Sequence, residues 1–180
     1  PDIALHLHTS DEPVDLQGGA AQLAIRYGPG HAPGLNDVPL LPSRFAPVCS
    51  PALQVNGTQD LARVPLLGFE WFRRDATTPD WPLWFERARL APLARQLHFS
   101  DEVHALQAAI AGQGIALVNL ALAAQELTDG VLCQPFGPEL DGHAFRVVWS
   151  QANDADPAVA QVRDWLLDEA GASPAPMPSR

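Results

Sequence analysis

The residues best suited to chemistry stand in one stretch, HFSDEVHALQAAIAGQGIALVN, which runs from His98 to Asn119. It opens with the hydroxyl group of Ser100, followed by the carboxyl groups of Asp101 and Glu102. Between a strand and a helix, such groups can hydrogen bond to a small polar ligand, or they can stabilise the positively polarised first turn of the helix. On the sequence alone, both interpretations stay open.

The same stretch predicts the elements that position these groups. Phe99 should close a short strand, and Ser100 should be the N-cap of a helix from Asp101 to about Ala111, with Gly112 as its C-cap. The apolar positions of that helix form the stripe that we expect to be buried: Val103, Leu106 and Ile110. The glycines follow the helix instead of preceding it, so the stretch does not form a phosphate-binding loop.

Arg26 is the candidate cation for a ligand site. It stands near the end of the predicted strand QLAIRYG, at residues 22–28. An anionic ligand close to the carboxylates of Asp101 and Glu102 would be repelled unless a cation balanced them, and a guanidinium group can do so. A salt bridge at the protein surface is the alternative role for Arg26.

Other reactive side chains do not form a recognisable catalytic or metal motif. His6 and His8 share one face of a predicted strand, 3–9, but no third ligand stands near them, so we expect exposed histidines and no bound metal. Cys49 and Cys133 lie far apart in the sequence and are expected to be buried free thiols. G-x-S-x-G, H-E-x-x-H, C-x-x-C and G-x-G-x-x-G motifs are all absent, which argues against an enzyme and against a cofactor.

The composition narrows the class of partner. The 180 residues carry 21 acidic and 11 basic side chains, giving a net charge of −10, which disfavours direct binding to nucleic acid or to an anionic membrane. No apolar run reaches the roughly 18 residues of a membrane span, and the first residues do not resemble a secretion signal. These features predict a cytoplasmic protein.

Strand and helix patterns alternate along the chain, which predicts an α/β fold with largely parallel sheets. In such sheets ligands bind beyond the carboxyl ends of the strands. WPLWFERA predicts a helix that buries Trp84 and Phe85, although Trp81 and Trp84 could instead edge a pocket.

Several segments, in order and spacing, resemble the effector-binding half of LysR-type transcriptional regulators, in the branch of the glycine-cleavage and β-lactamase activators. The segments are QLAIRYGPG, PVCSPAL, WPLWF, FSDEVHALQAAIAGQGIALVN, LAAQELTDGVLCQPF and VVWS with VRDWLLDEA. The resemblance extends to Gly171.

This resemblance implies a type II periplasmic-binding-protein-like fold of two α/β lobes, joined by two crossover strands near Phe45–Cys49 and Phe136–Phe145. Lobe I would comprise residues 1–46 and 142–180, without the family's first strand and helix, and lobe II residues 47–141. A small polar effector would bind in the cleft between them. The implied ligand-binding residues are Thr9, Ser10, Arg26, Tyr27, Phe99, Ser100, Asp101, Val118 and Asn119.

The implied function is effector sensing in a bacterial transcription regulator, without catalysis. DNA would be bound through an N-terminal domain absent from this chain, and the protein would form a homodimer or tetramer, with the exposed face of strand 3–9 in the contact. A stand-alone solute-binding protein of the same fold is the alternative, and a secretion signal in the gene would favour it.

Overall fold

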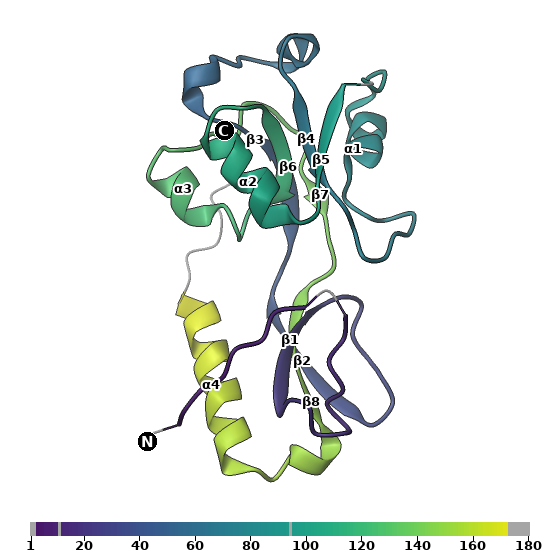
Figure 1. The fold of residues 1–180 in the computed structure, drawn as a ribbon, viewed down its shortest axis with the longest axis vertical. Coiled ribbons are helices and arrows are strands. Elements are labelled where there is room, and N and C mark those ends of the chain that lie inside the picture. The colour runs from purple at the N-terminus through teal and green to yellow at the C-terminus, as the bar shows by residue number, and fades with distance from the viewer. Residues whose placement is uncertain (1–2, 11, 94, 173–180) are drawn as a thin grey trace. The chain divides into compact units, whose positions relative to one another are not determined.

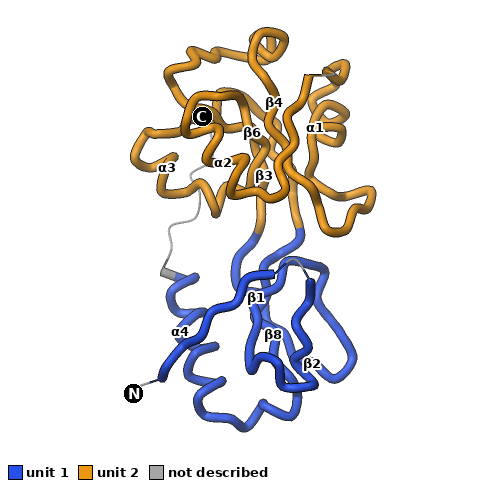
Figure 2. The backbone as a smooth tube through the Cα atoms, in the orientation of Figure 1, with its two compact units in different colours: residues 1–42, 143–177 blue, residues 43–142, 178–180 orange. Residues whose placement is uncertain are grey.

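The chain folds into two compact units in the computed structural model, which describes residues 3–10, 12–93 and 95–172. Of the described residues, one unit combines those up to Pro42 with residues 143–172, and the other comprises Ser43–Gly142 (Figure 2). We call them unit 1 and unit 2. Their boundaries fall at 42/43 and 142/143, whereas the family resemblance places the lobe boundaries at 46/47 and 141/142.

Unit 2 is built on a five-stranded sheet with the order β5-β4-β6-β3-β7. Its strands are β3 (Arg44–Val48), β4 (Leu66–Phe69), β5 (Gln96–Phe99), β6 (Ile115–Asn119) and β7 (Leu140–Asp141). β4 pairs in parallel with β5 and β6, while β3 pairs antiparallel with β6 and β7.

Three α-helices belong to unit 2: α1 (Trp81–Ala88), α2 (Glu102–Ile110) and α3 (Ala124–Thr128). α1 and α2 lie on opposite sides of the sheet (Figure 1). On the α2 side, Leu67 and Val118 pack with Leu106 in one buried cluster. On the α1 side, Trp81, Trp84 and Phe85 are buried, which confirms the prediction that this helix buries Trp84 and Phe85. Two 3-10 turns, η1 (Pro51–Leu53) and η2 (Thr58–Ala62), precede β4.

Unit 1 contains a three-stranded sheet with the order β1-β8-β2, from β1 (Leu23–Tyr27), β2 (Leu35–Leu41) and β8 (Phe145–Ser150). The 3-10 turn η3 (Gln151–Asn153) and helix α4 (Pro157–Ala172) follow. Val147 and Trp149 pack with Val159 of α4 in the core of this unit.

The prediction of largely parallel sheets is wrong. β8 pairs antiparallel with both β1 and β2, and unit 2 has a mixed sheet. The pattern of alternating strands and helices does not reveal that β3, β7 and β8 have antiparallel neighbours, because pairing direction depends on partners distant in the sequence.

The predicted strand over residues 3–9 is also wrong, because residues 3–10 have no regular secondary structure. Leu5 is 53% exposed and Leu7 is 91% exposed. An alternating pattern forms a strand only where a neighbouring strand pairs with it. In the described part of unit 1, β1, β8 and β2 pair only with one another, so residues 3–10 have no partner strand.

The helix in the stretch from His98 to Asn119 forms as predicted, with its start shifted by one residue. Asp101, not Ser100, is the N-cap, and its carboxylate accepts a hydrogen bond from the His104 N–H at 3.0 Å. The buried face of the helix differs from the predicted stripe, because Leu106 is buried but Val103 is 51% exposed. The C-cap is Ala111, and Gly112 follows it with the positive φ of 71° that ends the helix.

Candidate functional site

The carboxyl ends of three parallel strands meet at one edge of the unit 2 sheet. Phe69 of β4 is in register with Phe99 of β5, and β6 runs parallel to β4 and ends at Asn119. Ligands of open α/β sheets bind at such edges, where the following helices begin. The structure therefore brings five of the predicted site residues to one edge: Phe99, Ser100, Asp101, Val118 and Asn119.

Ser100 is the most accessible polar group among these five. Its side chain is exposed in the bend between β5 and α2, and its hydroxyl group donates a long hydrogen bond of 3.3 Å to Asp101. It lies directly before the amino end of a nine-residue helix, whose partial positive charge favours hydrogen-bond acceptors and anions. Ser100 is thus free to exchange its weak bond for a ligand contact.

Asp101 is engaged within its own helix turn. One carboxylate oxygen accepts the His104 N–H, and the other lies 2.7 Å from His104 Nδ1. The hydrogen bond from the His104 backbone, aided by the Ser100 hydroxyl and by the His104 ring, holds the pKa of the Asp101 carboxyl below its usual value. The geometry supports helix capping as the main role of Asp101.

Asn119 is buried, with 1% of its surface exposed, and both polar atoms of its side chain form hydrogen bonds. Its Nδ2 donates to Ser43 Oγ at 2.6 Å, and its Oδ1 accepts the Ala121 N–H at 3.0 Å. Its own backbone N–H donates to the Glu102 carboxyl group. Asn119 therefore links β6 by hydrogen bonds to the segment before β3 and to the start of α2.

Glu102 lies beneath this edge with a largely buried carboxyl group. Burial raises the pKa of the Glu102 carboxyl to about 7, although the hydrogen bond from the Asn119 backbone opposes the rise. A carboxyl group held in this way can accept a hydrogen bond in either protonation state. The sequence did not predict that Glu102 is buried, because its burial depends on β6, a strand that the helix reaches only in the folded structure.

Phe99 and Val118 are placed as packing residues. Val118 has no exposed surface and belongs to the buried cluster on the α2 side, and the half-buried Phe99 packs against that cluster. Their side chains shape the edge beneath Ser100.

The four other predicted residues lie in unit 1. Thr9 and Ser10 are exposed in the irregular segment, where Ser10 Oγ accepts the Glu12 N–H at 3.0 Å. The Tyr27 hydroxyl group accepts the His143 N–H at 3.0 Å, and the Tyr27 ring packs edge-on against Phe145.

Arg26 is half-buried on β1, opposite Arg146 of β8. Its Nη2 donates to the Val14 carbonyl oxygen at 2.6 Å, while its Nε is buried without a hydrogen-bond partner among the described residues. Arg146, by contrast, forms an ion pair with Asp37. Arg26 thus retains a buried donor that an additional acceptor could satisfy.

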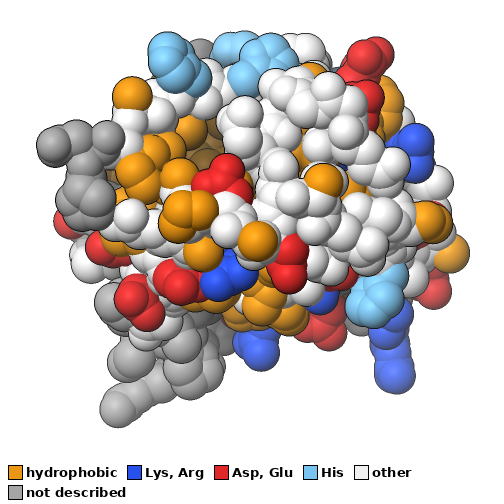
Figure 3. Space-filling model, turned by 90° about the horizontal axis from the view of Figure 1, so that it is seen from below, with side chains coloured by type: hydrophobic (Ala, Val, Ile, Leu, Met, Phe, Trp, Pro, Cys, Tyr) orange, Lys and Arg blue, Asp and Glu red, His pale blue; other side chains and the backbone are white. Residues whose placement is uncertain are grey.

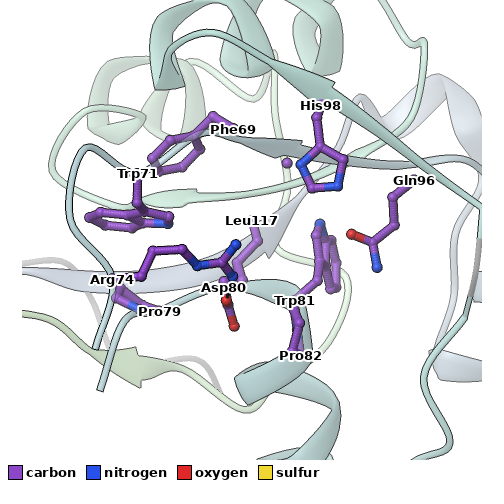
Figure 4. A pocket seen from close by; sticks show the side chains of 11 residues that line it. Phe69, Trp71, Arg74, Pro79, Asp80, Trp81, Pro82, Gln96, His98 and Leu117 are labelled. Atoms are coloured by element: carbon purple, nitrogen blue, oxygen red, sulfur yellow. Dashed lines mark hydrogen bonds and ion pairs between the residues drawn. The ribbon is translucent and has the colours of Figure 1, made fainter. Parts of the chain in front are cut away.

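A separate pocket lies on the α1 side of the unit 2 sheet, and none of the nine predicted residues lines it. Its volume is about 240 Å³, and the aromatic rings of Phe69, Trp71 and Trp81 face it (Figure 4). Gln96 and His98 project from the edge strand β5 into its rim. The remaining lining residues are Gly68, Arg74, Pro79, Asp80, Pro82 and Leu117.

The polar groups of this pocket are largely paired. Arg74 forms an ion pair with Asp80, and Trp81 Nε1 donates to the Leu67 carbonyl oxygen at 2.9 Å. The aromatic rings of this pocket can stack a small planar molecule, and His98 and Gln96 contribute further polar atoms to its lining.

The described residues include no group of three or more His, Cys, Asp or Glu side chains placed to hold a metal ion. On the face drawn in Figure 3, the arginine side chains are scattered among acidic and apolar ones instead of forming one basic patch. Within the described part of the chain, no helix is long and apolar enough to cross a membrane.

Comparison with known proteins identifies the family. Residues 1–171 match the LysR substrate binding domain, so the chain belongs to this family of effector-binding domains. Its architecture is the type II periplasmic-binding-protein-like fold of those domains, which confirms the fold expected from the sequence.

Two relatives with curated names are transcriptional activators. The chain is 31% identical to the HTH-type transcriptional activator AmpR of Pseudomonas aeruginosa over 175 residues, and 33% identical to the glycine cleavage system transcriptional activator of Escherichia coli over 180 residues. These alignments cover 94% and 96% of this chain, but only 57% of each relative.

A solved structure covers the same region. The effector domain of AmpR from Pseudomonas aeruginosa matches with a TM-score of 0.75 and 30% identity, over 94% of this chain and 82% of that one. The chain is thus an effector-binding domain of the kind found in LysR-type transcriptional activators.

Proposed function

We propose that this chain senses a small polar metabolite for a bacterial transcription regulator that binds DNA through a domain outside residues 1–180. The net charge of −10 supports DNA binding by a separate domain, because an acidic chain is unsuited to binding DNA by itself. Binding of the metabolite regulates transcription, and the chain catalyses no reaction. A regulator of this kind acts in the cytoplasm as a homodimer or a tetramer.

Within unit 2, the effector binds at the carboxyl ends of β5 and β6. The observation that carries this proposal is the exposed Ser100 hydroxyl group at the amino end of α2, above a buried network that fixes the edge. Ser100 donates to or accepts from the effector, Asp101 holds the helix start, and Asn119 positions the backbone of both elements. Phe99 and Val118 form the apolar floor.

For unit 1, the family resemblance supports participation of Thr9, Ser10, Arg26 and Tyr27 in effector binding. Arg26 has the strongest physical argument, because its buried Nε lacks a partner among the described residues. A carboxylate or another acceptor on the effector would satisfy this donor and would gain a charge-assisted hydrogen bond.

The ligand proposal is tested with a thermal-shift screen of amino acids, carboxylates and cell-wall fragments, followed by calorimetric titration of each stabilising compound. Ser100→Ala should weaken binding about 3- to 10-fold, the worth of one neutral hydrogen bond. Arg26→Ala should weaken it about 10- to 100-fold, since a charged group is lost.

His98→Ala is the matched control, because it removes a polar group from the pocket on the α1 side and leaves the strand ends intact. We expect this variant to bind the effector as the wild type does. If His98→Ala weakens binding while Ser100→Ala and Arg26→Ala do not, the effector occupies the α1-side pocket and the proposed site is wrong.

The regulatory part of the proposal is tested on the gene and on the full-length protein. A helix-turn-helix segment should be encoded ahead of Pro1, and the full-length protein should retard a DNA fragment from its own promoter region. A secretion signal ahead of Pro1, or a neighbouring transporter gene with no DNA binding, would instead identify a solute-binding protein.

Self-association is supported by the exposed apolar side chains of Leu5 and Leu7. Light scattering after size exclusion should give the mass of a dimer or tetramer, and Leu7→Asp should lower it. A monomeric wild-type chain at micromolar concentration would contradict association through this domain.

A further inference from the structure

The only two cysteines of the chain, far apart in the sequence, face each other in unit 2. Cys49 follows β3, Cys133 follows α3, and the two residues form an antiparallel bridge. The Cys49 N–H donates to the Cys133 carbonyl oxygen at 3.0 Å, and the Cys133 N–H donates to the Cys49 carbonyl oxygen at 2.9 Å. Directly paired residues project their side chains to the same side of a sheet, so the two thiols are neighbours.

The two thiols differ in their access to solvent. Cys49 has no exposed surface, whereas Cys133 is half-buried, and its Sγ lies 3.5 Å from the Cys49 carbonyl oxygen. Burial, together with the adjacent Cys133 sulfur, raises the pKa of the Cys49 thiol to about 12. A small oxidant in solution therefore reaches Cys133 first. The buried Cys49 thiol, with its raised pKa, reacts more slowly.

We propose that Cys49 and Cys133 form a redox modification site that closes into a reversible intramolecular disulfide in the presence of a small disulfide such as oxidised glutathione. First, the Cys133 thiolate attacks one sulfur of oxidised glutathione, which forms a mixed disulfide and releases one glutathione thiolate. The Cys49 thiolate then attacks Cys133 Sγ, which forms the protein disulfide and releases the second glutathione thiolate. Two protein thiols are oxidised, and one glutathione disulfide is reduced to two thiols.

The geometry indicates a labile bond. Hydrogen-bonded antiparallel pairs have Cα atoms about 5.5 Å apart, which a disulfide can span. Their Cβ atoms, however, are also about 5 Å or more apart, whereas a relaxed disulfide needs about 3.5–4.5 Å. The backbone must shift slightly to close the bond, and a strained disulfide is more easily reduced than a structural one.

The disulfide would link the segment after α3 covalently to the residue that follows β3. Leu132, next to Cys133, is part of the buried cluster on the α2 side, and Ser50, next to Cys49, caps the η1 turn.

The test is to incubate the native chain with oxidised glutathione at pH 8, block free thiols in denaturant, and map peptides by mass spectrometry without reduction. We expect loss of both free thiols and a peptide in which Cys49 is linked to Cys133. Dithiothreitol should restore both thiols. Because closure requires the Cys49 thiolate, its rate should rise about tenfold per pH unit between pH 7 and pH 9.

Two single variants serve as controls. Cys49→Ala should stop at the glutathione adduct of Cys133, and Cys133→Ala should leave the buried Cys49 unmodified in the native chain. Unfolding the protein in urea before oxidation should lower the yield of the linked peptide. A lasting glutathione adduct on wild-type Cys133, a link between Cys133 residues of two chains, or two unreacted thiols would each overturn the proposal.

Discussion

Replacing Glu102 with glutamine should make the protein more stable than the wild type at pH 8, with little difference below pH 4.5. Burial raises the pKa of the Glu102 carboxyl from 4.5 to about 7, against the hydrogen bond from Asn119. The folded protein therefore holds this proton more tightly than the unfolded chain does. The resulting stability is fully present below pH 4.5 and is lost as the pH rises through about 7.

The size of this effect follows from the change in pKa. At about 1.4 kcal/mol for each tenfold change in proton affinity, ionisation of Glu102 costs about 3 kcal/mol at most, since some water still reaches the carboxyl group. Glutamine has nearly the same shape and keeps an oxygen that accepts the Asn119 N–H, but it carries no charge. The variant should therefore keep the hydrogen bond and avoid the cost.

The assay is urea unfolding at several pH values from 4.5 to 8.5, followed by tryptophan fluorescence. The free-energy difference between Glu102→Gln and the wild type should grow with pH in favour of the variant. Glu86→Gln, on an exposed position of α1, controls for the removal of one acidic side chain from a protein with net charge −10. A difference that does not change with pH, or a wild type that is the more stable protein at pH 8, would refute the reasoning.

Three further substitutions test the packing around the site. Asp101→Ala should lower the free energy of unfolding by about 1 kcal/mol through loss of the N-cap, whereas Ser100→Ala should leave it unchanged; equal losses in urea unfolding would contradict the cap assignment. Gly114→Ala should cost about 1–3 kcal/mol in the same assay, because the new Cβ would lie 2.5 Å from a backbone oxygen just before β4. Gly171→Ala is the control, because its new Cβ would meet no atom within 4 Å beyond its chain neighbours and the backbone of its own helix. Trp84→Phe should lower the melting temperature by removing a hydrogen bond of 2.8 Å to a carbonyl group between α3 and β7, and an unchanged melting temperature would show that this bond is not needed.

Much of the unit 2 edge could be predicted from the sequence because it is built locally. A strand, a capped helix, a glycine turn and a second strand occupy consecutive residues from Gln96 to Asn119. Their apolar periods and their capping groups lie within a few positions of one another. The prediction erred by one residue at the helix start because Ser100 and Asp101 are both good N-caps, and only the folded backbone selects between them.

The strand predicted for residues 3–9 failed for a different reason. An alternating pattern describes which face a strand would bury, and it says nothing about whether a partner strand is available. Leu7, the most exposed of the large apolar residues in the described part of the chain, shows that no such face is buried there.

By itself, the sequence determined the class of fold, the family and the elements around Ser100, because these follow from hydrophobic periods, caps and a run of matched segments. Only the tertiary structure decided that Glu102 is buried under Asn119, that Cys49 faces Cys133, and that the sheets are antiparallel or mixed. The physical reason is that burial and strand pairing depend on residues many positions away. Their contacts are set by the packing of the whole unit and leave no local pattern in the chain.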